Sequence, residues 1–297
     1  MIELNRGTKI SSILTILIVV IIAISLVSFS GISEEKQTLK IATTTSLEDT
    51  GVLKELTDAF EKKYPNIHVQ TIASGTGQGL EYGKKGDVDL VMVHSKKQEL
   101  AFIEEGYGSN RTIFAYNFFY VVGPENDPAN IKGMTATEAF EKIMSSGESN
   151  PDAVQFLSRG DKSGTNTREI TIWNSTGRDY TTSIRDQPWY IETGKGMGDT
   201  LIIANEKSAY TLSDSATYLS FKGNITLTAL ITEGTDLLNV YSLIPINPDK
   251  FSHVNSDAAN KWIEFMTSKE GQEILGKYNV DGQKLFNPYL GIEDPKI

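Results

Sequence analysis

Apolar segments that run into loops rich in hydroxyl groups and glycine, and then into helical patterns, constrain the fold of this chain more than any other feature. Three such units occur, with the predicted strands Leu39–Ala42, Ile67–Ile72 and Ala153–Leu157. Their loops are Thr43–Ser46, Ala73–Gly79 and Ser158–Thr165. Alternating strands and helices predict α/β lobes with parallel sheets and right-handed crossovers. Ligands of such sheets bind at the carboxyl ends of the strands, where all three loops are expected.

The third loop, Ser158–Thr165, carries the groups that an oxyanion needs. Arg159 can form two parallel hydrogen bonds to two oxygens of one anion. Ser163 and Thr165 add hydroxyl donors, and Gly164 lets the backbone come close to a ligand. The free N–H groups of a helix that starts here also favour an anion. The alternative interpretation is a capped helix with a surface arginine, because serine and threonine are common caps.

The other two loops strengthen the anion hypothesis. Thr43–Ser46 consists of four consecutive hydroxyl residues, more than one helix cap uses. Taken alone, the glycine-rich segment Ala73–Gly79 would indicate no more than a flexible turn. Three strand–loop–helix units with donors at the same predicted edge together indicate an anion site.

Composition excludes several classes of function. The chain has 297 residues, enough for two lobes, and a formal net charge of -10, which argues against a nucleic-acid partner. An acidic protein that binds an anion must do so with local donors. Cysteine is absent, and the three histidines show no metal-ligand spacing, so we expect no bound metal cation and no cysteine-linked anchor.

The N-terminal region predicts an export or anchoring signal. Residues 10–33 contain no charged side chain, and Arg6 and Lys9 precede them. The run is long enough to span a bilayer and longer than the usual core of a signal peptide, which favours an uncleaved anchor over residues 1–33. Cleavage near Ser28–Ser30 and secretion is the alternative. Either outcome places the remaining chain outside the membrane, at the cell surface.

Several motifs in the same order resemble those of the tungstate-binding proteins of ABC importers. Thr43–Ser46 is similar to the family's TTTS motif, and Arg159–Thr165 to its RGDxSGT motif. Thr193–Leu201 resembles the TGxGMGxTL segment, and Tyr241–Pro248 resembles the segment that returns to the first lobe. The resemblance extends from about residue 38 to the C-terminus.

The resemblance implies a two-lobed α/β fold of the type II periplasmic-binding-protein kind, with two hinge crossings and an N-terminal hydrophobic helix before it. Lobe 1 would comprise residues 38–123 and 242–297, and lobe 2 residues 124–241. The chain would be a monomer without a cofactor that captures tungstate in the cleft and delivers it to an ABC permease. The implied ligand contacts are Thr44, Thr45, Ser46 and Ser74 from one lobe and Arg159, Ser163, Thr165 and Thr193 from the other.

Phosphate and molybdate are the alternative ligands. Phosphate near neutral pH can carry a proton, so its site requires a carboxylate acceptor, whereas tungstate, molybdate and sulfate require donors alone. Phosphate-binding relatives place an acidic residue after the strand Asp87–Val93, where this chain has His94-Ser95-Lys96-Lys97. Asp161 is a candidate acceptor, but pairing with Arg159 is the simpler role for it. Tungstate is chosen over molybdate on the family motifs alone, because the two anions have nearly the same size and charge.

Two other classes of function are less compatible with the sequence. A phosphatase-like enzyme would need a nucleophile and a base, and neither a GxSxG, an HExxH nor a P-loop motif is present. A membrane-anchored sensor would need a cytoplasmic output domain, for which the residues before the apolar run are too few. We therefore expect a binding protein rather than an enzyme.

Overall fold

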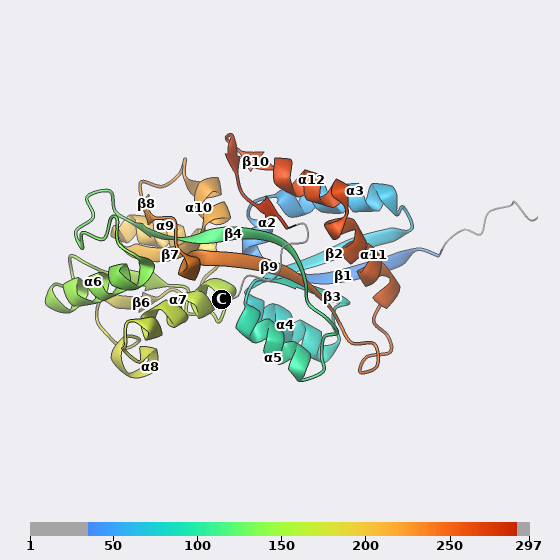
Figure 1. Cartoon of the computed structure of the whole chain (residues 1–297), viewed down its shortest axis with the longest axis horizontal. Coiled ribbons are helices and arrows are strands. Elements are labelled where there is room, and N and C mark those ends of the chain that lie inside the picture. Colours follow the sequence, from blue (N-terminus) through green and yellow to red (C-terminus); the bar gives the residue numbers. More distant parts are fainter. Residues whose placement is uncertain (1–34, 290–297) are drawn as a thin grey trace, which may run out of the picture. The chain divides into compact units, whose positions relative to one another are not determined.

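A mixed β-sheet runs through both lobes of the protein in the computed structural model, which describes residues 35–289 (Figure 1). Its strand order is β2-β1-β3-β9-β4-β7-β5-β6, with β8 and β12 also paired to β4. The strands are β1 (Gln37–Thr44), β2 (Ile67–Ser74), β3 (Leu90–Val93), β4 (Thr112–Gly123), β5 (Phe156–Ser158), β6 (Tyr190–Glu192), β7 (Tyr210–Asp214), β8 (Thr228–Ile231), β9 (Leu238–Pro245) and β12 (Asn287–Pro288). A separate hairpin joins β10 (Asn279–Val280) and β11 (Gln283–Lys284).

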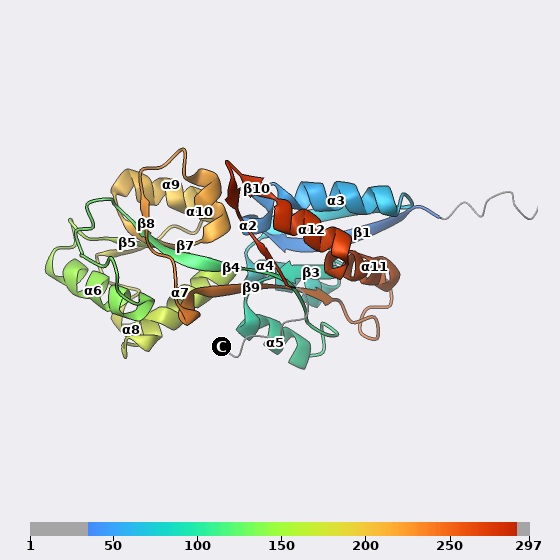
Figure 2. The ribbon, with the colours of Figure 1, turned by 45° about the horizontal axis from the view of Figure 1, so that its top comes forward.

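Helices cover both faces of the sheet in each lobe (Figures 1 and 2). In the first lobe they are α2 (Thr45–Glu48), α3 (Val52–Lys63), α4 (Thr76–Lys85), α5 (Lys96–Glu104), α11 (Ser256–Thr267) and α12 (Lys269–Lys277). In the second they are α6 (Ala136–Ser149), α7 (Gly164–Ser175), α8 (Tyr180–Ser183), α9 (Met197–Lys207) and α10 (Ser215–Phe221), and the short helix η1 (Thr235–Leu237) precedes β9. This arrangement confirms the predicted two-lobed α/β fold.

Apolar periodicity explains how these helices dock. Leu53, Leu56 and Phe60 recur on one face of α3, as expected for an amphipathic helix, and all three are buried. Phe60 packs edge-on against Trp262 of α11, with ring centroids 4.9 Å apart. This cluster and a second one around Phe102 cover opposite faces of the first-lobe sheet. The second lobe has its own core, in which Trp173 lies against Phe140 at 4.4 Å.

Two long strands, β4 and β9, connect the lobes. The first part of β4, up to Phe118, pairs with β9, and from Phe119 onward β4 pairs with β7. Asn117 of β4 and Asn239 of β9 are register partners at this change of neighbour. The predicted crossings near residues 122–124 and 241–245 lie in or beside these strands, and the predicted lobe limits stay a prediction.

The predicted parallel sheets are only partly correct. Strand β1 is parallel to β2 and β3, and β5 is parallel to β6 and β7, as the alternating pattern predicts. Strand β9, however, is antiparallel to β3 and β4, and β4 is antiparallel to β7. The reason is that β4 leaves the first lobe and β9 returns to it, so the two connecting strands must run in opposite directions.

Two helices near the C-terminus are separated at Ser268, whose side chain accepts a hydrogen bond from Gly271 N and caps α12. The predicted N-terminal hydrophobic helix and membrane anchor over residues 1–33 lie outside the described residues. Within residues 35–289 we find no helix that combines the length and apolar character of a membrane span.

Candidate anion-binding site

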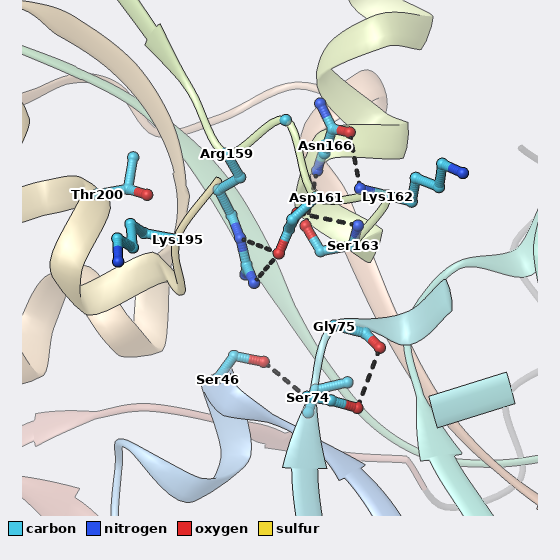
Figure 3. A network of polar contacts seen from close by, with 12 residues as sticks. Ser46, Ser74, Gly75, Arg159, Asp161, Lys162, Ser163, Asn166, Lys195 and Thr200 are labelled. Atoms are coloured by element: carbon cyan, nitrogen blue, oxygen red, sulfur yellow. Dashed lines mark hydrogen bonds and ion pairs between the residues drawn. The ribbon is translucent and has the colours of Figure 1, made fainter. Parts of the chain in front are cut away.

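The three donor loops meet where the two lobes touch. Strands β1, β2 and β5 end at Thr44, Ser74 and Ser158, so each loop leaves the carboxyl end of its strand as predicted. A Cβ atom at Gly75 of the first lobe would lie 3.2 Å from Ser163 Cβ of the second. Figure 3 shows Ser46 and Ser74 on one side and Arg159 on the other, with the guanidinium directed toward the serines.

Arg159 is the central cation of this contact. Its side chain is only 3% exposed, and it donates to Asp161 Oδ2 through Nε at 3.2 Å and through Nη2 at 2.6 Å. Asp161 Oδ1 accepts from Ser163 N at 3.0 Å, so the same carboxylate fixes both the arginine and the loop. These bonds confirm the bracing role predicted for Asp161.

A glycine allows the loop to turn into the site. Gly160 has φ +62°, in the left-handed region, and a Cβ there would lie 2.7 Å from Glu192 Cβ. A larger residue at this position would strain the backbone and force Glu192 or the loop to move.

A buried carboxyl that the sequence analysis missed holds the base of this loop. Glu169 of α7 accepts from Ser158 Oγ at 2.6 Å, from Tyr190 Oη at 2.6 Å and from Trp173 Nε1 at 3.1 Å. Burial raises the pKa of Glu169 to about 7, although these bonds oppose the shift. The signal for it was weak, because a lone glutamate in an amphipathic helix normally indicates a solvated face.

The start of α7 presents donors to the same place. Ser163 is the N-cap, and its Oγ accepts from Asn166 N at 3.2 Å. Thr165, in the first turn, is 1% exposed, and its Oγ1 is buried without a hydrogen-bond partner. A buried hydroxyl without a partner is unfavourable in the protein alone. It can be satisfied by a ligand that accepts hydrogen bonds.

The first lobe offers a matching set of hydroxyls. Ser46 is fully buried, and its Oγ lies 3.0 Å from Thr44 Oγ1. Thr45 Oγ1 is buried without a partner, as Thr165 Oγ1 is in the other lobe. Ser74 Oγ donates only a long hydrogen bond, 3.3 Å, to Gly75 O. The structure thus brings hydroxyls from both lobes toward Arg159, and their contact with a ligand stays a prediction.

Thr193 differs from the other predicted ligand contacts. Its Oγ1 donates to Ser158 O at 3.1 Å and lies 2.9 Å from Thr200 Oγ1, so its hydroxyl is engaged within the second lobe. The following loop nevertheless reaches the site, because a Cβ at Gly196 would lie 3.9 Å from Thr45 Cγ2. In this arrangement Thr193 supports the Arg159 loop.

Carboxyl groups near Arg159 reduce the net positive charge at the site. Burial, aided by Asp214, raises the pKa of Asp49 to about 6, and Arg159 opposes this shift. Burial also raises the pKa of Asp214, which caps α10 by accepting from Thr217 N at 2.9 Å. Arg159 is therefore balanced by acids, and the site must attract an anion mainly through directed hydrogen bonds.

A buried polar cluster that the sequence did not predict lies behind Ser46. It consists of Asn117, Asn239, His94 and Tyr241, each at most 5% exposed. His94 Nε2 lies 3.4 Å from Ser46 Oγ, and burial, reinforced by Arg159, lowers the pKa of His94 to about 4. The histidine is therefore neutral at physiological pH. Within residues 35–289 no group of histidine, cysteine and acidic side chains forms a candidate metal site.

Two lobes joined by two strands, with donors from both at their contact, define a two-lobed binding protein. Residues 30–270 match the family described as the PBP superfamily domain, and the chain belongs to this superfamily.

Close relatives include solved structures. The tungstate-binding protein TupA of Peptoclostridium acidaminophilum is 36% identical over 258 residues, which cover 86% of this chain and 87% of the relative. The structure of TupA from Desulfovibrio alaskensis G20 is 38% identical, with a TM-score of 0.69 over 86% of this chain and 99% of that one. A structure described as the tungstate ABC transporter from Geobacter sulfurreducens is 45% identical, with a TM-score of 0.71 over 82% of this chain and 100% of that one.

Proposed function

We propose that this protein is the substrate-binding component of an ABC importer and captures tungstate between its lobes. The observation that carries the proposal is that Thr45 Oγ1 and Thr165 Oγ1, two buried hydroxyls without a hydrogen-bond partner, belong to donor loops of opposite lobes. A tetrahedral oxyanion accepts hydrogen bonds in several directions and would satisfy both. The relatives named for tungstate binding support this choice of anion. The role is capture and delivery, without turnover of the ligand.

The proposed ligand contacts are those that the motifs predict. Arg159 would supply the positive charge, and the start of α7 would supply backbone N–H groups. The full proposed set is Thr44, Thr45, Ser46 and Ser74 from the first lobe and Arg159, Ser163, Thr165 and Thr193 from the second. Thr193 would act mainly by holding the Arg159 loop, given its bond to Ser158 O.

Function as an importer component implies a location and a partner. The protein would work as a monomer outside the cytoplasmic membrane and would pass tungstate to a membrane permease. The proposed lobes are residues 38–123 with 242–297, and residues 124–241. Binding would favour the closed arrangement, because only that arrangement brings both donor sets to one ligand.

Calorimetric titration with tungstate, molybdate, sulfate and phosphate under identical conditions tests the proposal. We expect tight binding of tungstate and weak or absent binding of phosphate. Arg159→Ala should weaken tungstate binding by at least about tenfold, since a charge-assisted hydrogen bond contributes about 1.5–3 kcal/mol. Arg185→Ala is the matched control, because Arg185 is 52% exposed and pairs with Glu192 at 3.5 Å. Binding of phosphate alone, or equal affinities of the two variants, would contradict the proposal.

A further inference from the structure

The buried cluster behind Ser46 links the candidate site to the strands that connect the lobes. Asn117 and Asn239 face each other on β4 and β9, and Asn239 Nδ2 donates to Asn117 Oδ1 at 2.8 Å. Asn239 Oδ1 lies 2.9 Å from His94 Nδ1, and Asn239 Nδ2 also donates to Tyr241 Oη at 3.1 Å. His94 and Tyr241 both reach Ser46 Oγ, at 3.4 Å and 3.3 Å.

The directions of these hydrogen bonds follow from one group that can only accept. The carbonyl oxygen of Leu285 accepts from Asn117 Nδ2 at 3.5 Å, which orients the Asn117 amide with its oxygen toward Asn239. Asn239 must then use its nitrogen on Asn117 and present its oxygen to His94. Amide and imidazole orientations are assigned from such networks, and the Leu285 carbonyl favours this one.

The same logic sets the protons of both neighbours of Ser46. His94 Nδ1 faces an oxygen and carries the hydrogen, so Nε2 of the neutral ring is an acceptor, and in the protein alone Ser46 Oγ donates to it across 3.4 Å. Tyr241 Oη receives a hydrogen from Asn239 and donates its own to Ser46 Oγ. When Ser46 turns its hydrogen toward a ligand, the contact with Thr44 Oγ1 requires Thr44 to be the donor. Both lone pairs of Ser46 Oγ are then occupied.

We propose that Asn239, through Tyr241, is a positioning residue that leaves Ser46 Oγ no free lone pair when Ser46 donates to a ligand, and so disfavours oxyanions that carry a proton. The inference rests on the proposed function and deepens it. Fully deprotonated tungstate, molybdate and sulfate would accept from Ser46. Hydrogen phosphate would direct its O–H at an oxygen with no free lone pair.

The geometry makes this cluster part of the closed site. A Cβ at Gly164 of α7 would lie 2.7 Å from His94 Nδ1 and 2.8 Å from His94 O, so the second lobe packs directly on the histidine. The ring of Tyr241 lies 4.7 Å from the His94 ring and 5.5 Å from Phe286. Removal of the Tyr241 hydroxyl alone therefore leaves the packing in place.

Tyr241→Phe tests the inference in the full chain. Sulfate and hydrogen phosphate have similar size and, at mildly alkaline pH, the same charge, and they differ mainly in one proton. Competition of each anion against tungstate should show the ratio of phosphate to sulfate affinity rising about tenfold in this variant, equivalent to one hydrogen bond to a charged group. An unchanged ratio would overturn the inference, and so would a variant in which neither anion competes with tungstate.

Tyr218→Phe is the matched control. Tyr218 is 4% exposed and donates to Leu227 O at 3.2 Å in the second lobe, away from Ser46. It should leave the ratio at the wild-type value. An equal rise in both variants would mean that loss of a buried tyrosine hydroxyl, rather than the link to Ser46, changes selectivity, and the inference would fail.

A second measurement needs no ligand and separates this inference from the proposed function. The chain has three histidines, so long-range ¹H–¹⁵N correlation spectra can identify His94 by the signal lost in His94→Gln. We expect a neutral ring protonated at Nδ1. A ring protonated at Nε2 would require the Asn239 amide to be turned round, so that Tyr241 would donate to Asn239 instead of Ser46, and the inference would be overturned. A wild-type protein that does not bind tungstate would overturn the proposed function instead.

Discussion

Gln98 of α5 makes a direct contact between the lobes, and its removal should weaken ligand binding without touching the anion site. Its Nε2 donates to Thr167 Oγ1 at 2.7 Å and to Lys162 O at 3.2 Å, both in the second lobe. A Cβ at Gly77 of the first lobe would lie 3.0 Å from the same Lys162 carbonyl. These contacts exist only while the lobes are together. Gln98 therefore stabilises the closed arrangement.

The magnitude follows from the two hydrogen bonds. A typical bond of this kind contributes about 0.5–1.5 kcal/mol net, and the partial exposure of this contact favours the lower half of that range. Gln98→Ala should therefore destabilise the closed form by about 1–2 kcal/mol. If ligand-free protein is mainly open, that loss appears as a tungstate affinity lower by about 5–30-fold.

Calorimetry and small-angle scattering together test this prediction. Gln98→Ala should bind tungstate more weakly, and at saturating tungstate it should still reach the closed dimensions of the wild type. Gln70→Ala, on the exposed side of β2, is the control for loss of a surface glutamine. If Gln98→Ala and Gln70→Ala bind tungstate as well as the wild type does, the reasoning that Gln98 stabilises closure is wrong.

Three further predictions follow from the site. Thr165→Val keeps the side-chain volume and removes only the hydroxyl; it should not lower the free energy of unfolding, because Thr165 Oγ1 has no partner, yet should reduce tungstate affinity by about tenfold or more. Thermal unfolding and calorimetry measure both quantities, and small-angle scattering should show no tungstate-induced compaction when Thr165→Ala and Ser46→Ala are combined. The pKa of His94 is about 4 in the folded protein and about 6.5 in the unfolded chain, so the unfolded state binds more protons between these two pH values. The free energy of unfolding should therefore fall as the pH is lowered through this range, by up to about 3 kcal/mol. Denaturant unfolding across that range should show this slope in the wild type and a flatter one in His94→Gln. Gly164→Ala should weaken tungstate binding more than a surface Gly223→Ala, since its Cβ would lie 2.7 Å from His94 Nδ1 whereas no atom lies within 4 Å at Gly223.

The order of strands, loops and helices was predictable from local patterns. Apolar runs that end in hydroxyl- and glycine-rich segments located β1, β2 and β5, and the same loops contain Ser46, Ser74 and Arg159. Donor chemistry is a property of residue type and spacing, so the composition of the loops was sufficient to indicate an anion. The antiparallel course of β4 and β9 was missed, because strand direction depends on which lobe each segment enters.

The sequence by itself determined the donors, and the tertiary structure alone decided their protons and their support. Asn117 and Asn239 are 122 positions apart, and only the register of β4 against β9 makes them partners. The sequence pattern around Glu169 is that of a solvent-facing residue, but in the structure Glu169 is buried and accepts hydrogen bonds from Tyr190 and Trp173. Local spacing specifies which groups a loop carries, whereas the direction of a hydrogen bond and the pKa of a buried group depend on neighbours that long-range pairing supplies.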